Sequence, residues 1–433
     1  MKVLGIIVEY NPFHNGHLFH LQKAKELIKP DYTIAVMSGN FCQRGEPAII
    51  DKFSRAEIAL RMGIDIVFEL PTVYAIQDAG GFARGAIGIL DGTGVVTDIV
   101  FGSESNDIEF LRKIAEILHE QPDLYNQFLH EELKKGYSFP NARKYALMRY
   151  VEKMKIMNPE KVRLIERSND ILGLEYIRAI LDLGSSITPH TIKRVGADYK
   201  EEEFKGKLSS ATAVRKLIKE GRMDLVRESV PEESFKVINR ELREGRGPVF
   251  LEDMEKLLLG IMRLKSRDDF SELYGFSEGL DERFHKFSKV SGSIEEFMEK
   301  VKSKRFTFTR IRRLMLHVLF EMKKDFVEKS NEKGPQYLRV LGFTDSGRKL
   351  LSKIKKVSRL PIISTVSLHR KVLEKALKDE ERRSMNVDTE LFEKQLLLDI
   401  KATNVHSLFF KSENERKGER DFKIQPVFLN LET

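Results

Sequence analysis

Residues 3–28 read VLGIIVEYNPFHNGHLFHLQKAKELI and contain the pattern that decides the fold. The apolar run 3–8 predicts a buried strand, and the spacing of apolar residues over 18–28 predicts an amphipathic helix. Between them, His14-Asn15-Gly16-His17 places two imidazoles and a glycine where the helix begins. A helix N-terminus offers unpaired N–H groups and positive partial charge, so this loop is suited to holding a phosphate.

Gly16 would let a nucleotide approach the backbone closely, and the two histidines can donate hydrogen bonds to phosphate oxygens. A pair of surface histidines in a strand–helix connection is the plain alternative. We favour the phosphate site because the strand end, the glycine and the helix start coincide.

The first ~200 residues continue to alternate between strand and helix patterns. Further strands are expected at 32–37, 64–68, 97–101 and 188–195, and helices at 53–62, 83–90, 108–118 and 171–183. Short, nearly continuous apolar strands that alternate with helices predict an α/β fold with a Rossmann-like, doubly wound parallel sheet. Ligands bind such sheets at the carboxyl ends of the strands, where the loops at residues 14–17, 37–40 and 101–104 would converge.

The length of 433 residues predicts two or three domains. We expect residues 1–220 to form a nucleotide-binding domain, with a helical insertion at about 122–165. After Gly221 the alternation stops, and helical periodicity, for example at 254–264 and 310–326, predicts a mainly helical, basic second domain over 221–433. A terminal strand is expected within 423–429.

The net charge of +8 lies entirely in the second half of the chain. Residues 221–433 hold 44 basic and 36 acidic side chains, and residues 301–378 alone hold 21 basic and 6 acidic ones. Such an imbalance predicts a polyanionic partner for this half. The basic residues of this stretch include Lys302, Lys304, Arg305, Arg310, Arg312, Arg313, Lys353, Lys355, Lys356, Arg359, Arg370 and Lys371.

Cys42 is the only cysteine, which excludes an internal disulfide framework and a cysteine-based zinc site. No signal peptide is recognisable, and no apolar run approaches the length of a membrane span. We therefore expect a cytoplasmic protein, with no membrane association and no stable protein partner.

A second motif, Ser209-Ser210-Ala211-Thr212-Ala213-Val214-Arg215, combines hydroxyl side chains with a basic residue at a helix start. With His14-Asn15-Gly16-His17, it resembles the two signatures of the class I nucleotidyltransferase superfamily, which position ATP for in-line attack on its α-phosphorus. The resemblance implies that His14, His17, Ser209, Ser210, Thr212 and Arg215 are the catalytic residues.

Longer blocks resemble one family, the bacterial tRNA(Met) cytidine acetate ligases, over nearly the whole chain. These blocks are residues 9–17, 37–47, 101–104, 169–176 and 341–347, followed by Pro361-Ile362-Ile363. The resemblance implies that ATP activates acetate as acetyl-adenylate, and that the acetyl group passes to N4 of the wobble cytidine of elongator tRNA(Met). Mg²⁺ would offset charge on the phosphates.

The resemblance also implies the nucleotide contacts. These are Ile7, Val8, Glu9, Tyr10, Asn11, Pro12, Phe13, His14, Asn15, Gly16, His17, Leu18, Phe19 and His20, together with Gly102, Asn169 and Arg194. Asp170 departs from the family pattern, which often has a second asparagine there, so Asn169 is the better candidate.

Each of these residues has a structural alternative. Gly102 could simply end a strand, Ser168, Asn169 or Asp170 could cap a helix, and Arg194 could pair with a surface carboxylate. The serines and threonine of 209–212 could likewise only cap the helix that follows. A further hypothesis assigns the acetate side of the crevice to Ser38, Asn40, Gln43 and Arg44.

The basic residues of 301–378 are either solvated helix faces or contacts to the RNA backbone, and we favour RNA. Phe306, Phe308 and His317 would supply stacking surfaces for unpaired bases. Two rival functions remain: an adenylyltransferase acting on a small phosphorylated metabolite, and a non-catalytic RNA-binding protein that does not bind ATP.

Overall fold

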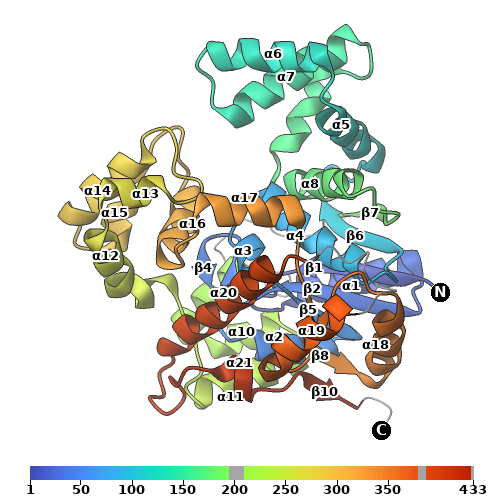
Figure 1. Cartoon of the computed structure of the whole chain (residues 1–433), viewed down its shortest axis with the longest axis vertical. Coiled ribbons are helices and arrows are strands. Elements are labelled where there is room, and N and C mark those ends of the chain that lie inside the picture. Colours follow the sequence, from blue (N-terminus) through green and yellow to red (C-terminus); the bar gives the residue numbers. More distant parts are fainter. Residues whose placement is uncertain (195–208, 379–386, 431–433) are drawn as a thin grey trace.

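The computed structural model describes residues 1–194, 209–378 and 387–430, and its centre is an eight-stranded sheet (Figure 1). The strand order is β10-β8-β5-β2-β1-β6-β7, with β9 paired to β8. The bounds are β1 Val3–Val8, β2 Tyr32–Ser38, β5 Ile66–Leu70, β6 Asp98–Ser103, β7 Thr188–Lys193, β8 Leu338–Thr344, β9 Ile362–Ile363 and β10 Val427–Leu429. Val195, predicted to end the strand at 188, lies outside the described residues.

The five strands from β5 to β7 run parallel to one another, whereas β8 is antiparallel to β5. Side chains of β1 alternate between two hydrophobic cores: Leu4, Ile6 and Val8 enter one core, and Val3 enters the other. Both faces of the sheet are therefore covered, as the apolar runs predicted. The predicted Rossmann-like, doubly wound α/β fold is confirmed, and its sheet is mostly rather than wholly parallel because of β8.

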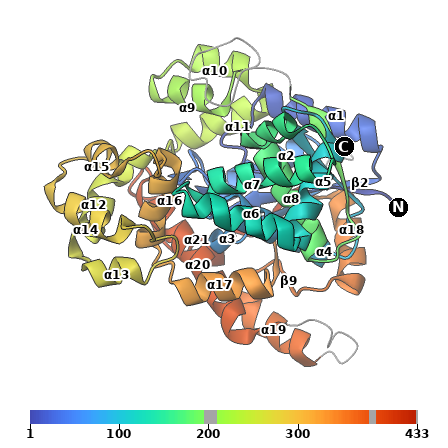
Figure 2. The ribbon, with the colours of Figure 1, turned by 90° about the horizontal axis from the view of Figure 1, so that it is seen from above.

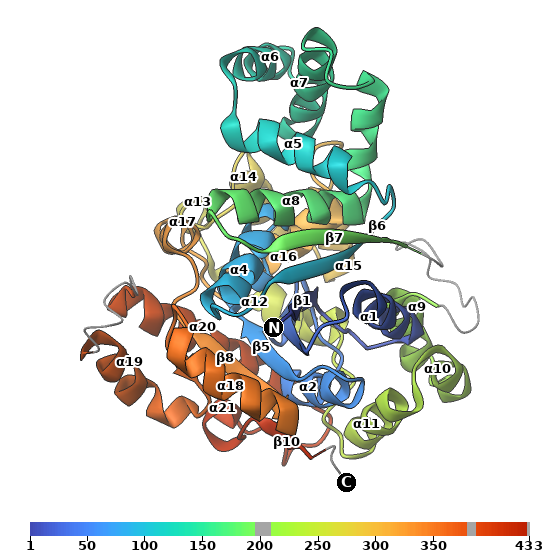
Figure 3. The same cartoon turned by 90° about the vertical axis from the view of Figure 1, so that its right-hand side faces the viewer.

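Helices from both halves of the chain cover the two faces (Figure 3). The core that receives Leu4 is closed by α1 Asn15–Ile28, α2 Lys52–Arg61, α9 Ala211–Lys219, α10 Met223–Ser229 and α11 Glu232–Arg243. The opposite core is closed by α3 Thr72–Ala75, α4 Ala79–Gly92, α5 Ile108–Glu120, α8 Ser168–Asp182 and α18 Asp345–Val357.

Two groups of helices extend away from the sheet (Figures 1 and 2). The predicted insertion forms α6 Asp123–Lys134, α7 Phe139–Lys153 and the 3-10 helix η1 Pro159–Glu166. The second group comprises η3 Leu251–Met254, α12 Glu255–Leu264, α13 Arg267–Ser271, α14 Leu280–Val290, α15 Ile294–Val301 and α16 Phe308–Leu319.

The second half of the chain is mainly helical, as predicted, and the expected terminal strand is β10. It also adds two strands that were not predicted, β8 and β9, to the central sheet. One hydrophobic core includes both Val3 and Leu338, so the expected boundary at residue 220 does not divide the sheet. The remaining elements are α17 Lys324–Lys333, η4 Val366–Leu368, α19 His369–Lys378, α20 Thr389–Leu408 and α21 Arg420–Lys423. β8 was not predicted because it is buried on both faces, so its sequence lacks the alternation of apolar and polar residues that marks a half-exposed strand.

Two helix predictions need correction. The helix expected over 310–326 is interrupted: α16 ends at Leu319 and α17 begins at Lys324, with Glu321 in the left-handed region at φ 51°. The helix expected from Ile171 begins at Ser168, so none of residues 168–170 is its N-cap. Arg167 holds that position without a side-chain cap.

No helix in the described part of the chain is long and apolar enough to cross a membrane.

Candidate functional site

The His14 loop joins the carboxyl end of β1 to the start of α1 (Figure 1). His14 is the N-cap of α1, and its Nδ1 accepts a hydrogen bond from the main-chain N–H of Gly16 at 3.1 Å. The main-chain N–H of His14 in turn donates to Nδ1 of His17 at 3.2 Å. Because both Nδ1 atoms accept, a neutral ring must carry its proton on Nε2, and each histidine is left with an Nε2–H donor.

Burial and nearby cations keep these rings neutral. The pKa of His14 falls to about 3 because the ring is buried and Arg194 and Arg215 are close. Burial and the neighbouring His14 lower the pKa of His17 well below its usual value, and burial lowers that of His20 to about 4. At neutral pH the site therefore combines neutral hydrogen-bond donors with arginine charges, which suits a polyphosphate.

The second motif lies directly against this loop. Arg215 donates to the carbonyl oxygen of Asn11 at 2.9 Å and to the hydroxyl of Thr212 at 3.3 Å, and it forms an ion pair with Glu46 at 2.7 Å. The buried Ser210 caps α9, because its hydroxyl accepts from the N–H of Ala213 at 3.1 Å. The structure thus brings the two predicted motifs together through Arg215.

Several members of the 7–20 segment shape the loop. The side chain of Asn11 accepts from the N–H of Ile49 at 2.9 Å, and the carboxylate of Glu9 accepts from the N–H of Gln43 at 2.7 Å. Tyr10 and Phe13 are buried and pack edge-to-face, with ring centroids 4.5 Å apart. The remaining members are Ile7, Val8, Pro12, Asn15, Gly16, Leu18 and Phe19, which form the end of β1, the loop and the start of α1.

Gly102, Arg194 and His20 are neighbours at the end of β6. A Cβ built on Gly102 would lie 4.0 Å from both Cγ of Arg194 and Cδ2 of His20. Arg194 follows β7 and donates its main-chain N–H to the carbonyl of Ser103 at 3.1 Å. Asn169 stands in the first turn of α8, where its amide contacts Glu104 of the loop that follows β6.

The residues considered for acetate are less suited to that role. Asn40 is buried; its Oδ1 accepts from the N–H of Lys52 at 2.8 Å, and its Nδ2 donates to Thr403 at 3.2 Å. The hydroxyl of Ser38 is buried and donates to Glu9 at 3.4 Å. These two side chains hold the end of β2 in place. Gln43 and Arg44 are half-buried in the turn between the short strands β3 Phe41–Cys42 and β4 Glu46–Pro47.

Sequence reasoning missed a fully buried arginine, Arg55, beneath the site. Its guanidinium donates to the carbonyl oxygens of Glu9, Ser38 and Gly39, which lie at the ends of β1 and β2. In the sequence Arg55 lies in an amphipathic helix, where a charged residue is normally assigned to solvent. Only the three-dimensional convergence of two strand ends gives it these partners.

The basic residues of 301–378 do not form one surface. Lys302, Lys304 and Arg305 lie at the α15–α16 junction, whereas Lys355 and Lys356 lie on α18, which the views show well apart from α16 (Figures 1 and 2). The stacking prediction is wrong for two residues, because Phe306 and His317 are buried. Phe308 is half-buried, with the ammonium of Lys302 4.1 Å from its ring centroid.

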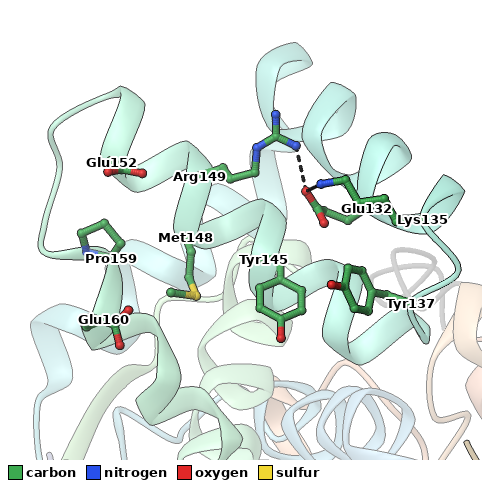
Figure 4. Close-up of a pocket in the computed structure, with 9 residues that line it drawn as sticks. All are labelled: Glu132, Lys135, Tyr137, Tyr145, Met148, Arg149, Glu152, Pro159 and Glu160. Carbon is green, nitrogen blue, oxygen red and sulfur yellow. Dashed lines mark hydrogen bonds and ion pairs between the residues drawn. The ribbon is translucent and has the colours of Figure 1, made fainter.

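A cavity of about 530 Å³ opens in the helical insertion between α6, α7 and η1 (Figure 4). Tyr137, Tyr145 and Arg149 contribute to its lining. None of the predicted site residues lines it. In the described part of the chain, no group of three or more His, Cys, Asp or Glu side chains could hold a metal ion.

Comparison with known proteins agrees with this geometry. The family described as HIGH Nucleotidyl Transferase matches residues 1–421. The tRNA(Met) cytidine acetate ligase of Thermotoga maritima is 63% identical over 425 residues, which are 98% of this chain and 100% of that protein. The ligase of the same name from Halothermothrix orenii is 40% identical over 434 residues, covering 100% of both.

A solved structure of Thermotoga maritima TmcAL bound with alpha-thio ATP superposes with a TM-score of 0.94 at 62% identity, covering 99% of this chain and 100% of that one. The fold and the two joined motifs define a HIGH nucleotidyl transferase. Within that class, the chain belongs to the family of tRNA(Met) cytidine acetate ligases.

Proposed function

We propose that this protein activates acetate with ATP as acetyl-adenylate and transfers the acetyl group to N4 of the wobble cytidine of elongator tRNA(Met). The observation that carries the proposal is the joining of the His14 loop to Arg215 in a chain that matches ligases of that name over their full length. ATP and tRNA are substrates of the cytoplasm, so we place the reaction there.

In the first step, an acetate oxygen attacks the α-phosphorus of ATP, and the bond from that phosphorus to the pyrophosphate oxygen breaks. Negative charge builds up on the α-phosphate oxygens and on the leaving pyrophosphate. The Nε2–H groups of His14 and His17 donate to these oxygens, and Arg194 and Arg215 supply positive charge. We assign the hydroxyls of Ser209, Ser210 and Thr212, at the start of α9 beside Arg215, to the same phosphates.

In the second step, the exocyclic amine of cytidine attacks the acetyl carbon, the bond from that carbon to the phosphate oxygen breaks, and AMP leaves. The amine loses one proton, which the departing phosphate or water accepts. Activation is needed because the amine lone pair is delocalised into the ring, and free acetate is a poor acyl donor. Mg²⁺ would enter with the phosphates of ATP, to which it normally binds.

The α15–α16 junction supports an RNA substrate at this site. Arg313 of α16 donates to the carbonyl of Gln43 at 3.4 Å, and a Cβ on Gly45 would lie 2.4 Å from the main-chain nitrogen of Arg313. The basic helix thus packs on the turn that carries Glu46, the partner of Arg215. We place the phosphate backbone of the tRNA along Lys302, Lys304 and Arg305, at the start of this helix.

Exchange of labelled pyrophosphate into ATP tests the first step. With tRNA(Met) present, we expect exchange to depend on acetate and to be lost when acetate is omitted. The rival function, adenylyl transfer to a small phosphorylated metabolite, predicts exchange that needs such a phosphate and ignores acetate. Exchange with phosphopantetheine or a mononucleotide, and none with acetate, would replace our proposal with the rival.

A further inference from the structure

Glu104 forms a compact carboxylate cap on the first turn of α8. Its Oε2 and Oε1 accept from the main-chain N–H of Asn169 at 3.1 and 3.2 Å, and Oε2 also accepts from that of Asp170 at 3.0 Å. The same carboxylate accepts from the side-chain Nδ2 of Asn169 at 2.6 Å. Glu104 therefore does two things at once: it caps a helix that has no side-chain cap of its own, and it holds the Asn169 amide.

The orientation of that amide follows from chemistry. A carboxylate can only accept hydrogen bonds, so the NH₂ end of Asn169 must face Glu104, and the carbonyl oxygen Oδ1 must face away. Among the described residues, none donates a hydrogen bond to this Oδ1. Asn169 is half-buried, so an acceptor of fixed direction is presented at the edge of the site.

Neighbouring contacts fix the loop that carries Glu104. The carboxylate of Asp170 accepts from the hydroxyl of Ser103, and from both the hydroxyl and the N–H of Ser105 at 3.0 Å. The loop after β6 and the first turn of α8 are thus linked twice: Glu104 of the loop accepts from α8, and Asp170 of α8 accepts from the loop. Both carboxylate oxygens of Asp170 accept hydrogen bonds from these serines. An asparagine has only one accepting oxygen and could not replace both, which explains the acidic residue here.

The acceptor lies on the side of the site where a nucleoside would lie. Gly102, two residues before Glu104, leaves the end of β6 without a side chain, and His20 of α1 borders it. Because β6 pairs directly with β1, a nucleotide whose phosphates contact the His14 loop would extend its nucleoside over the end of β6.

We propose that Glu104 is a positioning residue that turns the Oδ1 of Asn169 towards a hydrogen-bond donor of the ATP nucleoside, either the 6-amino group of adenine or a ribose hydroxyl. This inference rests on the proposed use of ATP. It adds a specificity element: guanine carries an acceptor at the position of the adenine amino group, and a deoxyribose lacks one hydroxyl, so each would leave this oxygen unpaired.

Calorimetric binding of nucleotide analogues tests the inference. The ligands are ATP, purine riboside 5′-triphosphate, which lacks the amino group, and the 2′-deoxy and 3′-deoxy forms of ATP. We expect the wild type to bind one of these analogues about tenfold more weakly than ATP, because one hydrogen bond is missing. The analogue that binds weakly identifies which donor faces Asn169.

Glu104→Gln should reduce that preference to about twofold or less. The substituted amide has only one accepting end, so it no longer forces the NH₂ group of Asn169 to one side. Glu104→Ala removes the carboxylate completely, so it should abolish the preference even where the glutamine still holds the Asn169 amide in part. Glu109→Gln is the matched control, because Glu109 is an exposed glutamate on α5 and its change should leave every binding ratio as in the wild type.

The ratio between analogue and ATP is the decisive readout, because a general loosening of α8 would weaken all nucleotides alike. Wild-type ratios in folded Glu104→Gln and Glu104→Ala proteins would overturn the positioning role while leaving ATP use intact. Equal affinity of the wild type for ATP and all three analogues would overturn it as well. A wild type that binds none of these nucleotides would overturn the proposed function and this inference together.

Discussion

The main-chain N–H of His14 donates to Nδ1 of His17 at 3.2 Å, and this bond sets the protonation pattern of the site. His14 accepts in the same way from Gly16, so the first turn of α1 uses up one nitrogen of each ring. The ring centroids of the two histidines are only 3.7 Å apart. A pair so close cannot both be charged without repulsion, and each ring is thereby kept as a neutral Nε2–H donor.

Substitution can separate the two roles of His14, which are the helix cap made by Nδ1 and the hydrogen-bond donor Nε2–H. His14→Asn keeps a good N-cap acceptor for the N–H of Gly16 but removes the Nε2–H donor, so we expect near-normal stability and a loss of about 10²–10³ in the rate of acetyl-adenylate formation. His14→Ala should lose that rate and, in addition, about 1 kcal/mol of stability. Pyrophosphate release and urea unfolding measure the two effects. Equal free energies of unfolding for His14→Asn and His14→Ala would show that the His14 side chain does not stabilise the start of α1.

The depressed histidine pKa values predict how stability depends on pH. The folded pKa of His14 is about 3 and its unfolded value is near 6.5, so below pH 6.5 the unfolded state binds the proton more readily and stability falls as pH falls. From pH 7.5 to 5, His14 should cost about 2 kcal/mol. The free energy of unfolding of His14→Asn should therefore fall by about 2 kcal/mol less than that of the wild type. Parallel curves for the two proteins would show that His14 titrates normally.

Arg215 should not tolerate lysine. Its guanidinium contacts Asn11, Thr212 and Glu46 at once, and an ammonium group cannot reproduce that planar set of donors. We expect Arg215→Lys to lower kcat/KM for ATP by about 10²-fold, a loss of about 2.7 kcal/mol in transition-state binding. Arg222→Lys, at an exposed arginine just beyond α9, is the control and should be near wild type. A fully active Arg215→Lys enzyme would show that charge alone suffices.

A buried ion network attaches the C-terminal segment to the sheet. Asp421 of α21 pairs with Lys52 at 2.9 Å and with Arg339 of β8 at 2.5 Å, and all three side chains are buried. Asp421→Ala would leave buried positive charge poorly compensated, so we expect a loss of about 3–5 kcal/mol in urea unfolding. Glu26→Ala, which breaks the exposed pair with Lys23, should cost less than about 1 kcal/mol. Similar costs for the two variants would contradict the network's structural role.

The tRNA surface can be mapped by salt dependence. Lys304→Ala with Arg305→Ala should weaken tRNA(Met) binding and lower the slope of log affinity against log salt by about 0.7–0.9 for each phosphate that the variant no longer neutralises. Lys355→Ala with Lys356→Ala, on the distant α18, is the matched control. Acetyl-adenylate formation should be normal in both. The reverse result, a smaller slope only in the α18 variant, would move the RNA surface to that helix.

Local sequence patterns predicted the central sheet and the His14 loop, because both depend on residues close together in the chain. The apolar run of β1 and the helix start at the His14 loop are of this kind. β8 was missed because its partners, β5 and β10, are distant in sequence and its buried faces show no alternation. The structural contacts of Asn40 and Arg55 were not predicted for the same reason: their partners come from other elements, and a polar residue in a turn or helix is usually solvated.

The most direct test of the central claim is mass spectrometry of elongator tRNA(Met) after incubation with the protein, ATP and isotopically labelled acetate. We predict that the label is found on the fragment containing the wobble cytidine, that omission of ATP or acetate abolishes it, and that His14→Asn reduces it strongly. A wobble cytidine that stays unlabelled, with folded wild-type protein that binds ATP, would contradict the account.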